Sequence, residues 1–409
     1  MVKMENIFHV TDLTKESPTE QLIAEAHSQV KSRKVFQVYE KDGRKMIFKP
    51  LSKSKPLTTP FFAYSEVFWS YIIHTYFDSS APRYYLATDQ KVLLDDPSWY
   101  SCGVLVESLT PRDEELINLF DYQMAHPDKQ LGVTDYINYC MEQYDYTKIL
   151  ESDFIKDHRE YGSQIASQIL LSILREDQNF HYENINFLKK GDNLSIAPPI
   201  DFEFSTPFLY PENEILSDYY HYCYCKQLGF PTERSSKEET ERGNMSEVVE
   251  FLYHRFSFKP PSLQTRNICM IVREYPEIVE KFLENLDRMN QSLLDIRLSD
   301  ADGFIQPFSS NAWAETKPIQ IVDLRKEELR DEDIDSGDDS FSPRYIVDLP
   351  STFAKIEEKV ATFSKQYQTL LQGYLEKYRD GIQDLESISP EEFFTKAKVF
   401  EKTLNKKQF

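Results

Sequence analysis

The sequence has few cysteines, no long apolar run and a deficit of positive charge. Its 409 residues include five scattered cysteines, an odd number that argues against a disulfide framework and for reduced thiols. Lysine and arginine total 47 against 68 aspartates and glutamates, a formal net charge of −21. Because nucleic-acid phosphates are held by clustered basic side chains, this balance argues against a protein that mainly binds nucleic acid.

A membrane segment and an export signal are also missing from the pattern. No run of about 18 apolar residues occurs, so we expect no membrane span. The first residues, MVKMENIFHVTDLTKESPTEQ, have neither the apolar core of a signal peptide nor a basic amphipathic helix. These absences predict a cytoplasmic protein. The 40% hydrophobic content allows a large core in two or three domains of roughly 150 residues each.

The N-terminal third predicts a small sheet with one helix. Arg33–Pro50 alternates around Asp42-Gly43, a strong hairpin signal because both central turn positions require positive φ. Tyr64–Phe77 has apolar residues on one helical face, with Glu66 in its first turn. Thr110–Phe120 opens a second helix with proline and acids at its start. Further strands are predicted at 84–88, 91–94 and 101–109.

The rest of the chain is mostly helical. Tyr161–Leu174 is largely apolar and predicts a buried helix. Two short strands are expected at 184–188 and 194–200, joined by KKGDN, and the second leads into Asp201 on the same strand. The acidic tract at 323–341 is typical of a linker. Residues 352–378 predict a long amphipathic helix that packs its aromatic stripe on the body of the protein.

Polar side chains gather around the two short strands. Asp177, Asn179, His181 and Asn184 lie within eight residues, and Asp201 follows the second apolar run. A carboxylate in an otherwise apolar strand needs a partner. Because Mg²⁺ prefers carboxylate and amide oxygens, these residues predict a metal and phosphate site.

The order of the charged residues along the chain suits phosphoryl transfer. Such a site needs a lysine on a strand for the nucleotide phosphates and a glutamate on the next helix to hold that lysine. It also needs oxygen ligands for Mg²⁺ and an aspartate that orients the attacking hydroxyl. Lys49, Glu66, Asp177, Asn184 and Asp201 occur in that order.

The segments that carry these residues resemble the HipA-like serine/threonine kinases, including the branch related to the Helicobacter cell-translocating kinase. The likeness lies in MIFKP followed by SEVFWSYI, in GVLVESL, in DQNFHYENINFL and in APPIDFEFS, over about residues 30–300. The resemblance implies an ATP- and Mg²⁺-dependent kinase with a protein substrate. It also raises the prospect of a toxin or secreted effector with an antitoxin or regulatory partner.

The resemblance also implies how the nucleotide would be held. ATP would lie between two lobes, with Lys49, held by Glu66, at its phosphates. The adenine edge would meet the backbone of Val106, Glu107 and Ser108. Residues 25–34, where kinases often carry a glycine-rich loop over the phosphates, contain no glycine.

The catalytic loop departs from the family pattern in one respect. Asn184 and Asp201 would hold Mg²⁺, and His181 would orient the loop by hydrogen bonding. The family usually has an aspartate two residues before this histidine, where the chain has Asn179. Either Asp177 takes the base position, with two extra residues before Asn184, or Asn179 does and the site lacks a base. We favour Asp177, because a missing base forfeits a typical ~10²–10⁴-fold contribution.

These patterns together predict an α+β protein with a bilobal protein-kinase-like fold. A small β-rich N-lobe is expected at 1–108, a helical C-lobe at 109–300, and an acidic linker with a helical C-terminal extension at 301–409. Two other functions stay open. The shifted aspartate and the glycine-poor loop favour a pseudokinase or nucleotide-sensing scaffold, and the same residues would also serve a small-molecule kinase.

Overall fold

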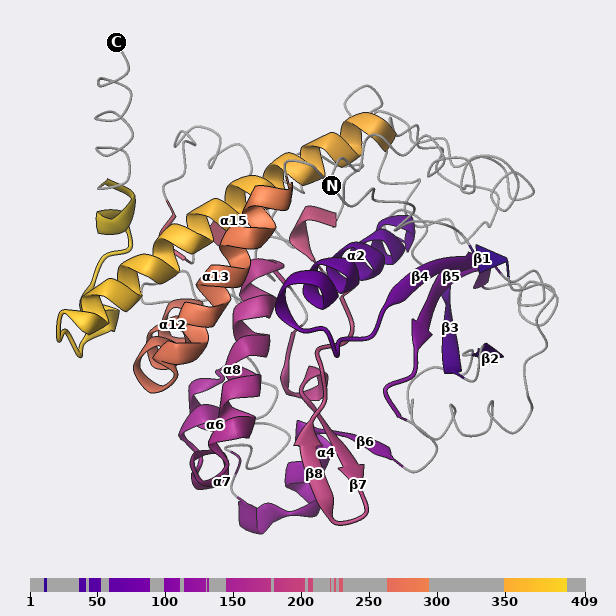
Figure 1. Ribbon diagram of the computed structural model, residues 1–409, viewed down its shortest axis with the longest axis horizontal. Coiled ribbons are helices and arrows are strands. Elements are labelled where there is room, and N and C mark those ends of the chain that lie inside the picture. The colour runs from indigo at the N-terminus through magenta and orange to yellow at the C-terminus, as the bar shows by residue number, and fades with distance from the viewer. Residues whose placement is uncertain are drawn as a thin grey trace, which may run out of the picture.

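The structure is a computed structural model, shown in Figure 1. It describes residues 11–12, 37–41, 44–52, 59–88, 99–110, 114–129, 131, 145–177, 180–202, 205–208, 221, 224–225, 228–230, 263–293 and 349–395. Four predicted features lie outside these residues: the loop at 25–34, the strand at 91–94, Asn179 and the acidic tract at 323–341.

A five-stranded sheet is built from the N-terminal part of the chain, in the order β1-β4-β5-β3-β2. Its strands are β1 (Thr11–Asp12), β2 (Gln37–Lys41), β3 (Arg44–Ser52), β4 (Tyr84–Thr88) and β5 (Trp99–Glu107). β1 runs parallel to β4 and the other pairs are antiparallel. Lys41 pairs with Arg44, which confirms the predicted hairpin at this place.

One glycine in this sheet allows a close approach between strands. Gly103 of β5 pairs with Pro50 of β3, and a Cβ at Gly103 would collide with the carbonyl oxygen of Lys49. The absence of a side chain at Gly103 therefore lets β5 lie close to the backbone of Lys49, and this close packing helps to position the Lys49 side chain.

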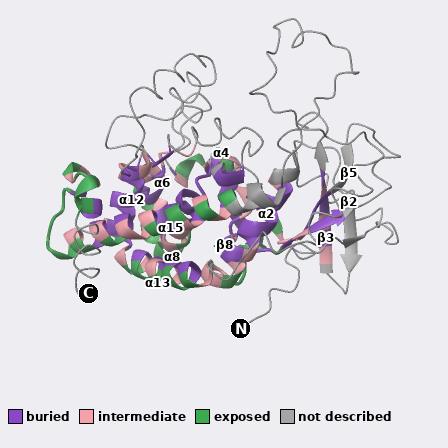
Figure 2. Cartoon of the chain, turned by 90° about the horizontal axis from the view of Figure 1, so that it is seen from above, coloured by how far each residue is buried: buried purple, intermediate pink, exposed green. Residues whose placement is uncertain are grey.

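Helix α2 (Thr59–Ile72) covers the sheet and continues into a π-helical turn, η1 (Ile73–Phe77). Almost all of its described residues are buried (Figure 2), including Trp69. The predicted helix is thus present, but it starts at Thr59. Glu66 therefore lies inside the helix, and its expected place in the first turn is wrong.

The helix predicted to open in Thr110–Phe120 is also wrong over most of that range. Glu115–Asn118 forms strand β6, and only then does α4 (Leu119–Ala125) begin. β6 pairs with β7 (Asn186–Lys190), which pairs in turn with β8 (Asn193–Ile196). β6 pairs with β7 from Asn118–Asn186 to Glu115–Lys189, and this pairing with a distant strand overrides the local acidic helix signal.

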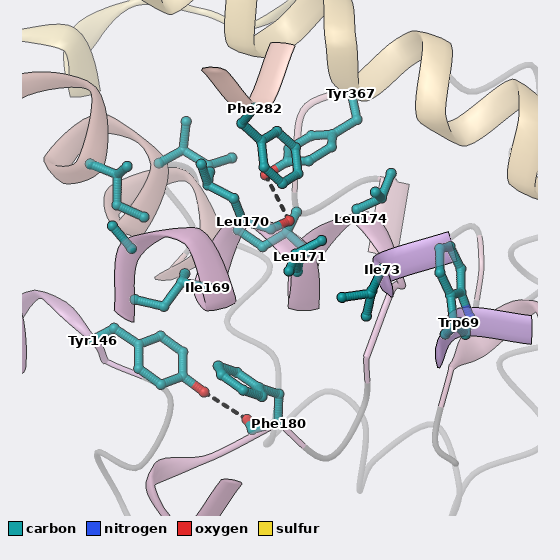
Figure 3. Packing of buried hydrophobic residues seen from close by; sticks show 14 of the residues in the cluster. Trp69, Ile73, Tyr146, Ile169, Leu170, Leu171, Leu174, Phe180, Phe282 and Tyr367 are labelled. Carbon is teal, nitrogen blue, oxygen red and sulfur yellow. Dashed lines mark hydrogen bonds between the residues drawn. The ribbon is translucent and has the colours of Figure 1, made fainter. Parts of the chain in front are cut away.

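Helices make up most of the rest of the described chain and pack around α8, which lies at the centre (Figures 1 and 3). They are α6 (Thr147–Glu151), α7 (Asp153–Asp157), α8 (Arg159–Leu174), α12 (Leu263–Glu274), α13 (Pro276–Leu293) and α15 (Leu349–Arg379). The hydroxyl of Tyr367 donates to the carbonyl of Leu170 at 3.3 Å (Figure 3). The predicted tail helix and its inward aromatic stripe are confirmed, because Phe363, Tyr367 and Tyr374 are buried.

The described elements make the chain α+β, as the sequence predicts. The segment that carries Asp201 follows directly after β8, which ends at Ile196. None of the helices that the structure describes combines the length and the apolar character required to cross a bilayer.

Candidate functional site

Three of the residues singled out in the sequence meet around one ammonium group. Lys49 Nζ lies 2.5 Å from Glu66 Oε1 and 3.3 Å from Asp201 Oδ1. Lys49 comes from β3, Glu66 from α2, and Asp201 from the segment after β8, 152 positions further along the chain. The side chain of Asp201 is 34% exposed and that of Lys49 18%, so solvent reaches both charged groups.

Glu66 holds its position through both carboxylate oxygens. Oε1 meets Lys49, and Oε2 accepts a hydrogen bond from the backbone N–H of Phe202 at 2.9 Å. Burial raises the pKa of Glu66, the Lys49 ammonium opposes that rise, and the Asp201 carboxylate adds to it. Glu66 thus links Lys49 of the sheet to the segment that carries Asp201. The favourable effect of an acid near a helix N-terminus does not explain these contacts.

Asp201 does not continue a strand, contrary to the sequence prediction. β8 ends at Ile196, and Asp201 has a φ of 62°, in the left-handed region that non-glycine residues rarely occupy. Its N–H donates to the hydroxyl of Tyr84 at 3.3 Å, and the next carbonyl, of Phe202, accepts from the Ser65 hydroxyl. Contacts on both sides therefore hold the backbone in a conformation that turns the carboxylate toward Lys49.

Arg175 is a functional candidate that sequence reasoning missed. Its guanidinium is buried, donates to Asp177 Oδ2 at 2.6 Å, and reaches the carbonyl of Asp201 at 3.5 Å. It also lies 4.7 Å from the centre of the Phe202 ring. The sequence did contain a signal for Arg175, because a charged residue that directly follows a buried apolar helix needs partners.

The same network extends to α2. The Ser205 hydroxyl donates to the carbonyl of Arg175 at 2.6 Å and accepts from Trp69 Nε1 at 2.8 Å. Asp177 and Ser205 also form an isolated antiparallel bridge. Asp177 is therefore held near the Asp201 segment, but its carboxylate faces Arg175 and its side chain is only 4% exposed.

His181 and Asn184 close a short turn. The His181 N–H donates to Asn184 Oδ1 at 2.9 Å, and His181 Nδ1 accepts from the Glu183 N–H at 3.2 Å. His181 thus makes the kind of hydrogen bonds expected of a residue that orients the loop. In the described part of the chain, Asn184 makes no hydrogen bond to Lys49 or Asp201. Its carbonyl oxygen has a second lone pair for a further ligand.

Two backbone N–H groups at the end of β5 already donate hydrogen bonds to neighbouring residues. The Ser108 N–H donates to the carbonyl of Lys45 at 2.9 Å, and the Glu107 N–H to that of Arg83 at 3.4 Å. Val106 lies inside the strand and pairs with Ile47. An adenine ring against this strand end could not take a hydrogen bond from the Glu107 or Ser108 N–H groups without breaking these bonds.

The oxygen donors of the candidate site suit Mg²⁺ that is bound together with substrate phosphates. Among the described residues, no three His, Cys, Asp or Glu side chains cluster as metal ligands. Mg²⁺ is commonly bound by one or two carboxylates together with substrate phosphates and water. Asp201, with its exposed carboxylate, and the oxygen of Asn184 fit that pattern.

A second buried ion pair lies directly before Asp177, and sequence reasoning missed it. Glu176 is fully buried with a φ of 51°, and its Oε2 lies 2.8 Å from His221 Nδ1. Cys225 Sγ lies 3.6 Å from His221 Nε2. Burial alone would lower the pKa of His221, but the Glu176 carboxylate, helped by Cys225, raises it to about 11. His221 is therefore a cation at neutral pH.

Replacing His221 by glutamine is expected to lower the free energy of unfolding by about 3–5 kcal/mol at neutral pH, because a buried carboxylate loses its cation. Since the pKa is raised in the folded state, the stabilisation is complete below the ordinary value of 6.5 and is lost as pH rises toward about 11. Urea unfolding across this range should show the wild-type and variant curves converging. A double variant that also carries Glu176→Gln should recover much of the loss, and a constant gap at all pH values would contradict the assignment.

No protein-family model and no curated protein sequence matches the chain. Among solved structures, the chain is similar to the Helicobacter pylori proinflammatory kinase CtkA. The TM-score is 0.41 and the sequences are 10% identical, over 91% of this chain and 99% of that one. At this distance a structural likeness is not evidence for a shared activity, so a function has to be inferred from the contacts of the chain itself.

Proposed function

We propose that the chain is an ATP- and Mg²⁺-dependent phosphotransferase with a bilobal protein-kinase-like fold, acting on a serine or threonine hydroxyl of a protein. The observation that carries the proposal is the position of Lys49 Nζ between Glu66 and Asp201. A buried glutamate that holds a partly exposed lysine, with a second carboxylate beside it, is the arrangement that phosphate positioning requires. We also expect a regulatory or antitoxin-like partner.

Each residue has a physical task in this proposal. Glu66 keeps the Lys49 ammonium fixed, so that the cation needs no reorganisation when phosphate oxygens approach it. Asp201 and Asn184 would hold Mg²⁺, which when bound spreads the negative charge of the phosphates. Arg175 holds both the Asp201 carbonyl and the Asp177 carboxylate, and so keeps the two loops in register.

The proposal is tested by incubating the chain with Mg-ATP and a general acceptor protein, followed by intact mass. We expect a gain of phosphate on the chain or on the acceptor. Calorimetry should show that ATP binds more weakly when EDTA removes Mg²⁺. Equal ATP affinity with and without EDTA, together with no transferred phosphate, would rule out this function.

A second candidate function is a pseudokinase that binds nucleotide without transfer. The observation in its favour is the Asp177 carboxylate, which faces a buried guanidinium and is almost fully enclosed. A carboxylate so placed has to leave Arg175 before it can accept a proton from a substrate hydroxyl. ATP binding with no transfer to the chain or to an acceptor would support this candidate.

Replacing Asp177 by asparagine tests whether Asp177 takes the base position of a phosphotransferase. If Asp177 orients the hydroxyl, transfer should fall by about 10²–10⁴-fold while ATP binding is unchanged. Initial rates with radiolabelled ATP and calorimetry would measure the two effects. Thermal unfolding has to accompany them, because Asp177 also pairs with Arg175. Activity that survives Asp177→Asn but is lost in Asn179→Ala would show that Asn179, and not Asp177, takes the base position.

A further inference from the structure

A cavity of about 260 Å³ lies between α8, α13, the residues around η1 and the segment that follows β8. Its walls contain none of Lys49, Glu66 and Asp201, so it is separate from the candidate site. Pockets for drug-sized ligands measure about 300–1,000 Å³, and this cavity therefore suits a smaller molecule.

Two helices present polar side chains to this cavity at regular spacing. On α8 the pair Ser-Gln is repeated, at 163–164 and again at 167–168, so that one helical face carries two hydroxyls and two amides. On α13, Lys281 and Asn285 are also four residues apart and line the opposite side. The hydroxyls and amides can each donate or accept a hydrogen bond, so among these side chains the Lys281 ammonium is the one that favours an anionic ligand.

The lining of the cavity has one anionic and one cationic side chain, Asp78 and Lys281. Lys281 is exposed and has no ion-pair partner among the described residues. The carboxylate of Asp78, which also lines the cavity, already accepts hydrogen bonds from the Ser80 N–H at 2.9 Å and the Ser80 hydroxyl at 2.5 Å. These hydrogen bonds orient the Asp78 carboxylate and leave its charge in the wall, whereas Lys281 is the cation of the lining and matches a carboxylate.

The remaining residues of the lining indicate the shape and polarity of the rest of the ligand. The rings of Phe77 and Phe282 lie 4.9 Å apart and, with Pro199, form an apolar wall. Gln168 is 4% exposed and donates to the carbonyl of Ala197 at 2.7 Å. Its Oε1 has no hydrogen-bond partner among the described groups, so a ligand hydroxyl would supply one.

We propose that this cavity binds a small organic acid with a flat apolar body and a hydroxyl group. The acid lies at Lys281 with the serine hydroxyls of α8, and the apolar body lies against Phe77 and Phe282. Ala197 and Pro199 belong to the wall, and Asp201 follows two residues after Pro199. Occupation of the cavity therefore stiffens the segment that carries Asp201.

Three probes with the same ring test the chemistry: 4-hydroxyphenylacetate, tyramine and 4-methylphenol. Calorimetric titration of the full chain should show saturable binding of 4-hydroxyphenylacetate. The ammonium and the neutral probe should bind at least about tenfold more weakly, because they lack the charge that pairs with Lys281. No saturable binding of 4-hydroxyphenylacetate, or equal binding of tyramine, would overturn the proposal.

Two substitutions in the cavity and one control outside it locate the binding. Lys281→Met should weaken 4-hydroxyphenylacetate binding at least about tenfold, whereas Lys365→Met, at an exposed position of α15 outside the cavity, should not change it. Ser167→Trp should fill the cavity and remove binding, provided that thermal unfolding shows a folded chain. If that variant does not fold, the lysine pair decides. Unchanged binding in Lys281→Met would place the ligand elsewhere and refute the site.

The link to Asp201 rests on the proposed function and has its own readout. Because coupling between two sites is reciprocal, Mg-ATP should change the affinity for 4-hydroxyphenylacetate, and the acid should change the affinity for Mg-ATP by the same factor. Acid binding that is indifferent to Mg-ATP would remove the link and leave the cavity site standing. Absence of Mg-ATP binding would refute the proposed function and leave the cavity experiment unaffected.

Discussion

Replacing Lys49 by methionine is expected to lower the rate of phosphate transfer from Mg-ATP by about 10²–10³-fold. The variant keeps a side chain of similar length and removes the ammonium group that Glu66 holds in place at 2.5 Å. Loss of one preorganised group that stabilises developing charge commonly has an effect of this size. Initial rates with radiolabelled ATP measure it, at saturating nucleotide so that weaker binding does not contribute.

Matched controls separate this effect from a general loss of charge. Lys190→Met removes an exposed lysine from β7 and should leave the rate unchanged. In the same way, Asp201→Asn should abolish transfer, whereas Asp192→Asn, in the exposed turn between β7 and β8, should not. A Lys49→Met variant that transfers phosphate at the wild-type rate would refute the proposed role of the lysine.

Replacing Arg175 by methionine is expected to destabilise the chain by about 3–5 kcal/mol. The substitution leaves the Asp177 carboxylate buried, with a side chain only 4% exposed, and without the guanidinium that lies 2.6 Å away. It also removes the contact of the guanidinium with the Phe202 ring. Urea unfolding monitored by fluorescence would measure the loss of stability.

A second substitution shows whether the buried charge causes this loss. The double variant Arg175→Met with Asp177→Asn removes both charges and should recover a large part of the lost stability. The exposed pair of Arg159 and Glu277, at 2.9 Å, provides a comparison. Arg159→Met should change stability by less than about 1 kcal/mol. Equal losses from the buried and the exposed arginine would contradict the expected role of burial.

Elements with a strong local pattern were predictable from the sequence. The β2–β3 hairpin, the buried helix α8 and the tail helix α15 occur where they are predicted, and the β7–β8 hairpin is present although β8 ends at Ile196 and not at residue 200. In each of them the residues that repeat along the chain also share one face in space. The error in Thr110–Phe120 arose where a short segment pairs with a distant strand, because acidic residues near a proline carry no information about that partner.

The candidate site was predictable in its residue types and only partly in its geometry. Lys49, Glu66 and Asp201 meet, while Asp177 faces Arg175 and Asn184 closes a turn with His181. Arg175, His221 and Glu176 had no motif that marked them. His221 lies 45 positions from Glu176, and Arg175 lies 26 positions from the Asp201 carbonyl, so only the folded chain brings these groups together.

By itself, the sequence determined the α+β class, the main helices and hairpins, and the order of the charged residues along the chain. These follow from local periodicity and turn chemistry, which act between residues a few positions apart. The tertiary structure decided where Glu66 sits in its helix, the left-handed backbone of Asp201 and the partner of Asp177. These depend on burial, because a desolvated charge takes whichever opposite charge the packing of distant segments brings within reach.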